Sequence, residues 1–196
     1  KMNIQSTTQE DSLIFVTAEL QYMMQNYEQA AAGLATYLTR FCPGGRYCVN
    51  AMHYAANSYY ILEQYEQAKE QYMELTKIDG NPYMEKACMR VAEISYDQKD
   101  YSTALTYFER MHAVASDRNM AQTALLGMMR CSHYINNNDA SIKHATSMLA
   151  LENLSNAIYN EALYYRASAY RKNKQYSAAI ADYTLLAKEV RSAWGA

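Results

Sequence analysis

Histidine and cysteine side chains are the groups in this sequence best suited to chemistry, and their spacing predicts no reactive centre. The four histidines and four cysteines are His53, His112, His133, His144, Cys42, Cys48, Cys88 and Cys131. They contain neither an HExxH nor a CxxC pattern, the usual spacings of zinc ligands. Cys131 and His133 lie two residues apart on an expected helix, about 200° around its axis, so they cannot face each other as nucleophile and base. We therefore expect no catalytic residue, no metal and no cofactor.

Cys42 and Cys48 flank a turn that runs from Pro43 to Gly45. A bridge between them could form in an oxidising compartment. Ordinary thiols are the simpler interpretation, and the sequence leaves the question open.

The composition favours a helical protein that binds no nucleic acid. Two Pro and six Gly allow long uninterrupted helices, and 20 Tyr and 12 Met supply apolar contact area. The net charge is only −2, and Lys and Arg form no cluster that would attract a phosphate backbone. No run of apolar residues reaches the length of about 18 that a membrane span needs.

One sequence pattern recurs five times, for example as QNYEQAAAGLATYL at 25–38 and EQYEQAKEQYMELT at 63–76. Each copy has a small residue that we call the B anchor, and the spacings between successive anchors are 38, 36, 37 and 38 residues. Apolar or aromatic residues follow most anchors at +4 and +7, which defines one face of an α-helix. The B anchors are Ala30, Ala68, Ala104, Ser141 and Ala179.

A second helix is expected before each B anchor. The residue twelve positions before each B anchor is here called the A anchor. It is alanine in four of the five copies. A small residue beside a large one at i, i+4 lets two helices approach closely. Each copy therefore predicts helix A, a short polar turn and helix B. The A anchors are Ala18, Ala56, Ala92, Met129 and Ala167.

These five in-phase copies resemble the tetratricopeptide repeat (TPR) family. The resemblance implies an all-α fold, a right-handed α-solenoid of about five antiparallel helix pairs. The period is longer than usual, and the fourth copy departs from the pattern at Asn138, Ser141 and Ala145. The long period and the Pro43–Tyr47 junction look like TPR units of bacterial cell-envelope proteins.

The predicted organisation is a short extension at 1–10, an array at 11–190 and the start of a continuation at 191–196. The expected units are 11–43, 46–79, 82–116, 118–151 and 155–190. The fourth unit should pack least tightly, so the array should bend or open there. An uncovered last helix should self-associate or fray through 176–194, with Trp194 as its reporter.

In the TPR family the A helices line a concave groove, and the resemblance implies which positions face it. Tyr recurs at one of these positions, as Tyr22, Tyr60 and Tyr96, and Glu93 and Arg130 would offer opposite charges to a ligand. The alternative is that these rings only pack between neighbouring A helices. The predicted partner-binding residues are Tyr22, His53, Asn57, Tyr60, Lys86, Met89, Glu93, Tyr96, Arg130, His133, Tyr164 and Arg171.

The sequence thus predicts a non-enzymatic scaffold that binds a protein or a peptide in this groove. The alternative is a structural spacer or assembly subunit of a bacterial envelope complex, with the groove unused. The sequence does not settle the compartment, although the resemblance favours the bacterial periplasm or the outer-membrane periphery over the cytoplasm.

Overall fold

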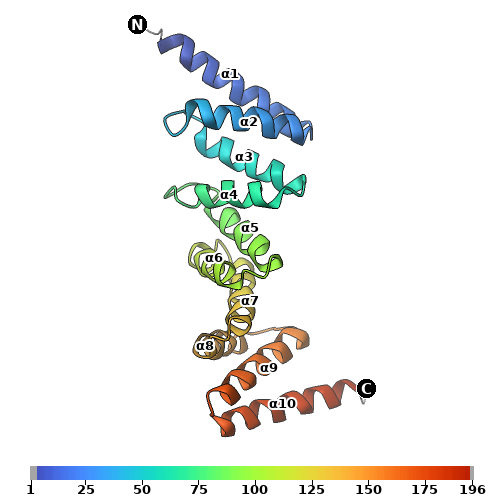
Figure 1. Cartoon of the computed structure of the whole chain (residues 1–196). Coiled ribbons are helices and arrows are strands. Elements are labelled where there is room, and N and C mark those ends of the chain that lie inside the picture. Colours follow the sequence, from blue (N-terminus) through green and yellow to red (C-terminus); the bar gives the residue numbers. More distant parts are fainter. Residues whose placement is uncertain (1–3, 195–196) are drawn as a thin grey trace. The chain divides into compact units, whose positions relative to one another are not determined.

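The computed structural model describes residues 4–194, with side chains described for residues 9–188, and this part of the chain is entirely helical or turn. Its helices pack in sequence as five pairs in a TPR-like solenoid, which confirms the predicted fold class (Figure 1). The handedness and the exact unit limits stay predictions. The helices are α1 Ile4–Met23, α2 Tyr27–Phe41, α3 Cys48–Ile61, α4 Tyr65–Leu75, α5 Met84–Asp97, α6 Tyr101–Val114, α7 Arg118–Tyr134, α8 Asn138–Leu149, α9 Asn156–Lys172 and α10 Tyr176–Trp194.

The chain divides into two compact units, Lys1–Ile94 and Ser95–Ala196, each with its own apolar core. In the first unit the core joins α1, α2 and α3, and in the second it joins α7, α8 and α9. The first core consists of Phe15, Ala18, Ala30, Leu34, Tyr37, Cys48, Ala51 and Ala55, and the second of Leu125, Met129, Ala145, Met148, Ala162 and Tyr165.

All ten anchor residues are at most 3% exposed, as the repeat pattern predicts. Small side chains at these positions let the helices approach closely, so close packing explains why the positions recur. The start of α1 differs from the expected layout. Helix α1 begins at Ile4 and therefore already includes residues 4–10.

Each turn from helix A to helix B contains one residue with a positive φ, always five positions before the B anchor. Glu63 has a φ of 59° and Lys99 a φ of 62°, although neither is glycine. The N–H of Glu63 donates to the Tyr60 carbonyl and the next N–H donates to the Tyr59 carbonyl. This pair of hydrogen bonds is the Schellman motif, which closes a helix through a left-handed residue. The residues in this position are Gln25, Glu63, Lys99, Asn136 and Lys174.

Glycine at these turns is expected to stabilise the protein. A left-handed conformation costs a residue with a Cβ about 1 kcal/mol, and glycine adopts it freely. Glu63→Gly and Lys99→Gly should each raise the free energy of unfolding by up to about 1 kcal/mol in urea denaturation. Glu70→Gly, on the exposed side of α4, should lower it by about the same amount through lost helix propensity. Equal losses from all three variants would contradict this account.

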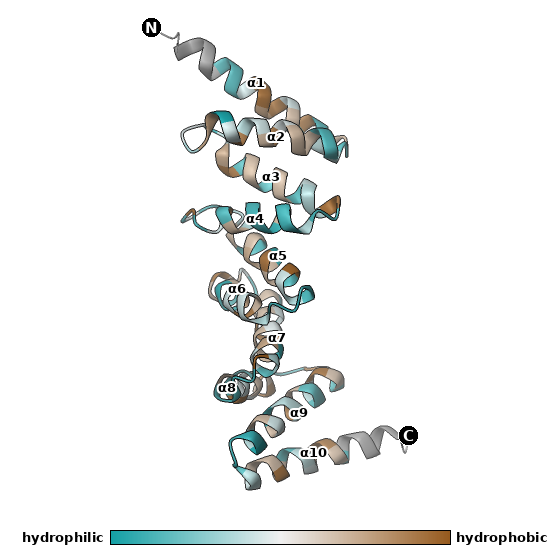
Figure 2. Ribbon diagram, viewed as in Figure 1, coloured by the Kyte–Doolittle hydropathy of each residue, from teal (hydrophilic) through white to brown (hydrophobic). Residues whose placement is uncertain are grey.

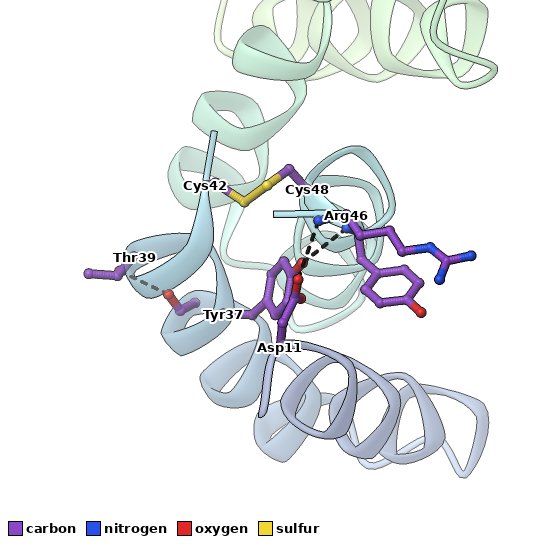
Figure 3. The surroundings of a disulfide bond; sticks show 8 residues. Asp11, Tyr37, Thr39, Cys42, Arg46 and Cys48 are labelled. Carbon is purple, nitrogen blue, oxygen red and sulfur yellow. Dashed lines mark hydrogen bonds between the residues drawn. A yellow bond between two sulfur atoms is a disulfide. The ribbon is translucent and has the colours of Figure 1, made fainter. Parts of the chain in front are cut away.

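Cys42 and Cys48 form a disulfide, although free thiols were the favoured expectation (Figure 3). The turn between α2 and α3 brings their Cα atoms within 5.6 Å, inside the range that a disulfide spans. The same turn is held by the buried Tyr37, whose hydroxyl accepts a hydrogen bond from the Tyr47 N–H at 3.0 Å. The junction between the first two helix pairs is therefore cross-linked.

The fourth pair, α7 and α8, buries its small contact residues as completely as the other pairs do. Ser141 is 1% exposed and Ala145 is fully buried. The polar turn also contacts the following pair, because the Asn138 amide donates to the Asn173 side chain at 3.0 Å. Bending or opening at this unit stays a prediction. The side chain of Trp194 lies outside the described part of the chain. Of the expected continuation at 191–196, residues 191–194 belong to α10, and residues 195–196 lie outside the described part.

Candidate functional site

The predicted binding face of the first unit is formed by α3 and α5, and its centre is a buried polar network. Asn57 Nδ2 lies 2.9 Å from His53 Nε2, and the Tyr72 hydroxyl donates to Asn57 Oδ1 at 2.8 Å. The His53 ring also stacks on Tyr83, with 3.7 Å between the ring centroids. Two predicted binding residues, His53 and Asn57, are thus 7% and 6% exposed, and they are held rigidly.

This network leaves one nitrogen of His53 without a partner. Tyr72 donates to Asn57 Oδ1, so the amide nitrogen faces His53 Nε2 and donates to it. The proton of the neutral ring then lies on Nδ1, which is buried and has no hydrogen-bond partner within the described residues. Burial lowers the pKa of His53 to about 4, with a smaller contribution from the Lys86 charge. The ring is therefore neutral near pH 7 and presents an unused donor.

Tyr60 and Arg90 form the second part of this face. The Arg90 guanidinium lies over the Tyr60 ring at 4.2 Å, and one of its nitrogens donates to the Tyr60 hydroxyl at 3.1 Å. The same nitrogen donates to Glu93 at 2.7 Å. The Nε of Arg90 is buried and has no partner among the described residues. Tyr60 on α3 thus packs against Arg90 on α5, the next A helix, and its role in ligand binding stays a prediction.

Lys86 lies one helical turn before Arg90 on α5 and is half-buried. Burial lowers its pKa, and the Arg90 charge lowers it further. Among the described residues no carboxylate forms an ion pair with it. Met89, half-buried, follows on the same helix. This face therefore carries two buried donors without acceptors, on His53 and Arg90, beside the half-buried ammonium of Lys86.

In the second unit the predicted residues pack on one another. Tyr96 meets Tyr101 and Tyr134 edge to edge at 5.3 and 6.2 Å, and Tyr101 stacks on Tyr134. Burial raises the pKa of Tyr96. His133 stacks on Tyr165 at 4.2 Å. Because Tyr134 also meets Tyr165, these rings form one aromatic cluster with members on α5, α6, α7 and α9.

Glu93 and Arg130 do not offer free charges, contrary to the expectation. Glu93 pairs with Arg90, as described above, and Arg130 makes two hydrogen bonds of 2.7 and 2.8 Å to Glu161. The paired carboxylate of Glu161 keeps a lowered pKa, because hydrogen bonds from Arg130 outweigh the effect of burial. A ligand would therefore meet neutralised pairs at these two positions.

The remaining predicted residues lie at different depths. Tyr22 is half-buried and packs against Tyr27 and Tyr54, at 5.6 and 4.9 Å between ring centroids. Tyr164 is 48% exposed, and Arg171 is exposed near the end of α9. The first unit therefore gathers His53, Asn57, Tyr60, Lys86, Met89 and Glu93 on α3 and α5, whereas Tyr22 lies on α1.

The described residues contain no cluster of three or more potential metal ligands among His, Cys, Asp and Glu. Burial raises the pKa of Cys131 to about 12, so this thiol stays protonated and unreactive near neutral pH. No described helix is long and apolar enough to cross a membrane.

The fifth helix pair carries the match to a known family. A model of the tetratricopeptide repeat matches residues 161–191, which belong to α9 and α10. The chain is a tetratricopeptide repeat protein. TPR proteins are protein-interaction scaffolds and are typically non-catalytic. The sequence matches no curated protein.

Solved TPR structures share this fold over nearly the whole chain. YrrB, described as a TPR protein with an unusual peptide-binding site, aligns with a TM-score of 0.61 at 14% identity, over 90% of this chain and 84% of its own. MamA from Desulfovibrio magneticus RS-1 aligns with a TM-score of 0.56 at 15% identity, over 93% of this chain and 96% of its own. A putative kinesin light chain with TPR-like repeats from Podosopora anserina aligns with a TM-score of 0.55 at 13% identity, over 94% of this chain and 95% of its own. At these identities the likeness shows the fold alone.

Arg90 is the residue of this TPR face that the sequence analysis missed. It lies two positions before the A anchor Ala92, beside the predicted Met89 and one turn after the predicted Lys86. Its spacing from Lys86 could have indicated it, because residues at i and i+4 share a helix face.

Proposed function

We propose that this TPR protein is a binding scaffold, and that the α3–α5 face of its first unit holds an acidic segment of a partner protein. The observation that carries the proposal is the pair of buried donors without acceptors, His53 Nδ1 and Arg90 Nε, beside the half-buried ammonium of Lys86. A buried donor without an acceptor costs about 1–3 kcal/mol, so such groups call for an explanation. A carboxylate of a partner would supply an acceptor at this face and offset the charge of Lys86, which forms no ion pair with a described carboxylate, whereas Arg90 already pairs with Glu93.

The surroundings of these donors support a peptide-sized ligand. The hydrogen bonds among His53, Asn57 and Tyr72 hold the His53 ring in place, which lowers the conformational entropy lost on binding. Met89 and the Tyr60 ring add apolar and aromatic surface beside the charges. The disulfide between Cys42 and Cys48 supports an oxidising compartment such as a periplasm, and the envelope location remains part of this proposal.

A matched pair of lysine variants tests the proposed site. The tightest binder from a synthetic peptide library would be titrated by calorimetry, in its acidic form and with each Asp and Glu replaced by Asn and Gln. We expect the acidic form to bind better, and Lys86→Gln to weaken it roughly tenfold, or about 1.4 kcal/mol. Lys77→Gln makes the same charge change at an exposed lysine and should leave the affinity unchanged.

Two results would count against this site. If the amide form binds as well as the acidic form, the donors do not recognise carboxylates. If neither form binds, the spacer role, with this face unused, becomes the better interpretation. Circular dichroism of both variants would show that the fold is intact.

A further inference from the structure

The outer face of α1 exposes side chains at positions that every other A helix buries. Leu13, five residues before the A anchor, is 68% exposed, and Leu20, two residues after the anchor, is 53% exposed. The equivalents of Leu13 are alanines that are fully buried, and the equivalents of Leu20 are at most 4% exposed. These equivalents are Ala51, Ala87, Ala124 and Ala162 for the first position, and Ser58, Ile94, Cys131 and Ala169 for the second.

Within the array, an A helix packs against the B helix of the preceding pair. Helix α2 packs on α3, α6 on α7 and α8 on α9. The exposed face of α1 is therefore shaped for a B helix. Val16, Met23 and Met24 extend its apolar surface, and hydrophobic bands mark α1 in Figure 2. Such a row of large apolar side chains on one helix marks an interaction surface.

Helix α10 is a B helix whose matching face is open. Ile180, one residue after the B anchor, is 65% exposed, whereas the equivalent Ala31 is 5% exposed. The other equivalents, Lys69, Leu105 and Ile142, are half-buried. A hollow of about 370 Å³ lies beside Ile180, with Thr184 and Ala187 among its lining residues.

We propose that copies of this chain associate head to tail, with α1 of one copy packed on α10 of the next. The occupant of the α1 face is then a B helix, as in the internal junctions. The shapes fit at two points, since Leu13 and Leu20 project further than the internal Ala and Ser, and the hollow on α10 has the small residues Thr184 and Ala187 beside Ile180, Tyr183 and Lys188. Burying these exposed leucines would supply a hydrophobic driving force for the association of two copies.

The α1 side offers a complementary hollow of about 470 Å³ between α1 and α2. Its floor includes Ala18 and Gly33, so there is room for Ile180 of the next copy. Its polar lining is neutral, and Gln29 could accept a hydrogen bond from Lys188 beside the α10 hollow, whereas the Gln21 oxygen already accepts one from Asn26. Among the lining residues of the two hollows, Lys188 is the single charged side chain, so no like charges oppose each other there.

This contact joins two different surfaces, so it can repeat and form a chain of copies. It uses the outer faces of α1 and α10 and leaves the α3–α5 face free. The proposal therefore does not depend on the acidic ligand proposed above.

Two single variants with opposite defects test the contact. Sedimentation velocity over a concentration series should show the unmodified chain associating. Leu20→Glu blocks the α1 face and Ile180→Glu blocks the α10 face, so each alone should weaken association roughly tenfold or more. Mixed together they should form a one-to-one dimer and nothing larger, because each retains the face that the other lost. Ile61→Glu, at an exposed apolar position at the end of α3, should associate normally.

Each other outcome overturns the proposal. If the unmodified chain stays monomeric at every concentration, α1 is not covered by a second copy. If Ile180→Glu still associates while Leu20→Glu does not, two α1 faces pair with each other. If the mixed variants form no dimer, the contact is not head to tail. All three substitutions replace exposed side chains, and circular dichroism would verify that the variants fold.

Discussion

Asp182→Ala is expected to destabilise the last helix pair by about 3 kcal/mol. Asp182 on α10 is 4% exposed and receives two hydrogen bonds of 2.7 Å from Arg166 on α9. These hydrogen bonds raise the pKa of Arg166, so the cation persists after its partner is removed. The loss leaves a guanidinium that is only 19% exposed, and the Thr146 hydroxyl is then its remaining hydrogen-bond acceptor among the described residues.

Hydrogen exchange would locate this effect. The stability of a repeat array is approximately a sum of local terms, so amides of α9 and α10 should lose protection while those of α3 and α4 keep it. Glu74→Ala breaks a pair with Lys77 in which both side chains are about half exposed or more, and it should cost less than about 0.5 kcal/mol. Similar losses from both variants would mean that burial does not determine the strength of these pairs.

The repeat pattern predicted the fold because it depends on side-chain size at fixed spacing. Ala68 and Ala104 must be small wherever two helices touch, so their burial follows from their recurrence alone. The positive φ of Glu63 and Lys99 could not be predicted in this way. These residues lack the usual glycine signal, and the packing of the flanking helices imposes the conformation.

The repeat pattern alone did not reveal which charged residues of the candidate site pair with each other, because this depends on how the helices pack. Equivalent residues lie about 37 positions apart, but the hydrogen bonds of the site charges join residues of successive A helices at a shorter separation. Tyr60 contacts Arg90, 30 residues later, and Arg130 contacts Glu161, 31 residues later. This offset reflects how neighbouring A helices cross, which is a property of the packed pairs. Comparing equivalent positions therefore predicted which residues share a face but missed the partners of its charges.

The Cys42–Cys48 bridge shows a similar limit. Its short spacing allowed a disulfide, but only the turn between α2 and α3 brings the two Cα atoms within 5.6 Å. The predicted binding residues themselves remain untested as ligand contacts, because their packing against one another does not show what they bind.

Gly127→Ala is expected to lower the free energy of unfolding by about 1–2 kcal/mol. Gly127 on α7 lies two positions before its A anchor, where the other A helices have larger side chains such as Arg90 and Tyr165. The ring of Phe108 on α6 occupies that space. A Cβ at residue 127 would lie 2.5–2.6 Å from three ring atoms, far inside van der Waals contact. Phe108 is 7% exposed, so its ring has little room to move.

The sign of this effect depends on two opposing contributions. Alanine favours a helix over glycine by about 1 kcal/mol, whereas overpacking a core costs about 1–3 kcal/mol, and a contact this short favours the upper part of that range. Gly44→Ala is the matched control, since its Cβ would meet only the Phe41 carbonyl oxygen at 3.9 Å, and urea denaturation should show almost no change. Adding Phe108→Leu should recover part of the loss in the Gly127→Ala background. A Gly127→Ala variant as stable as the unmodified chain would mean that α6 and α7 separate at little cost, and that the small residue at position 127 does not set their distance.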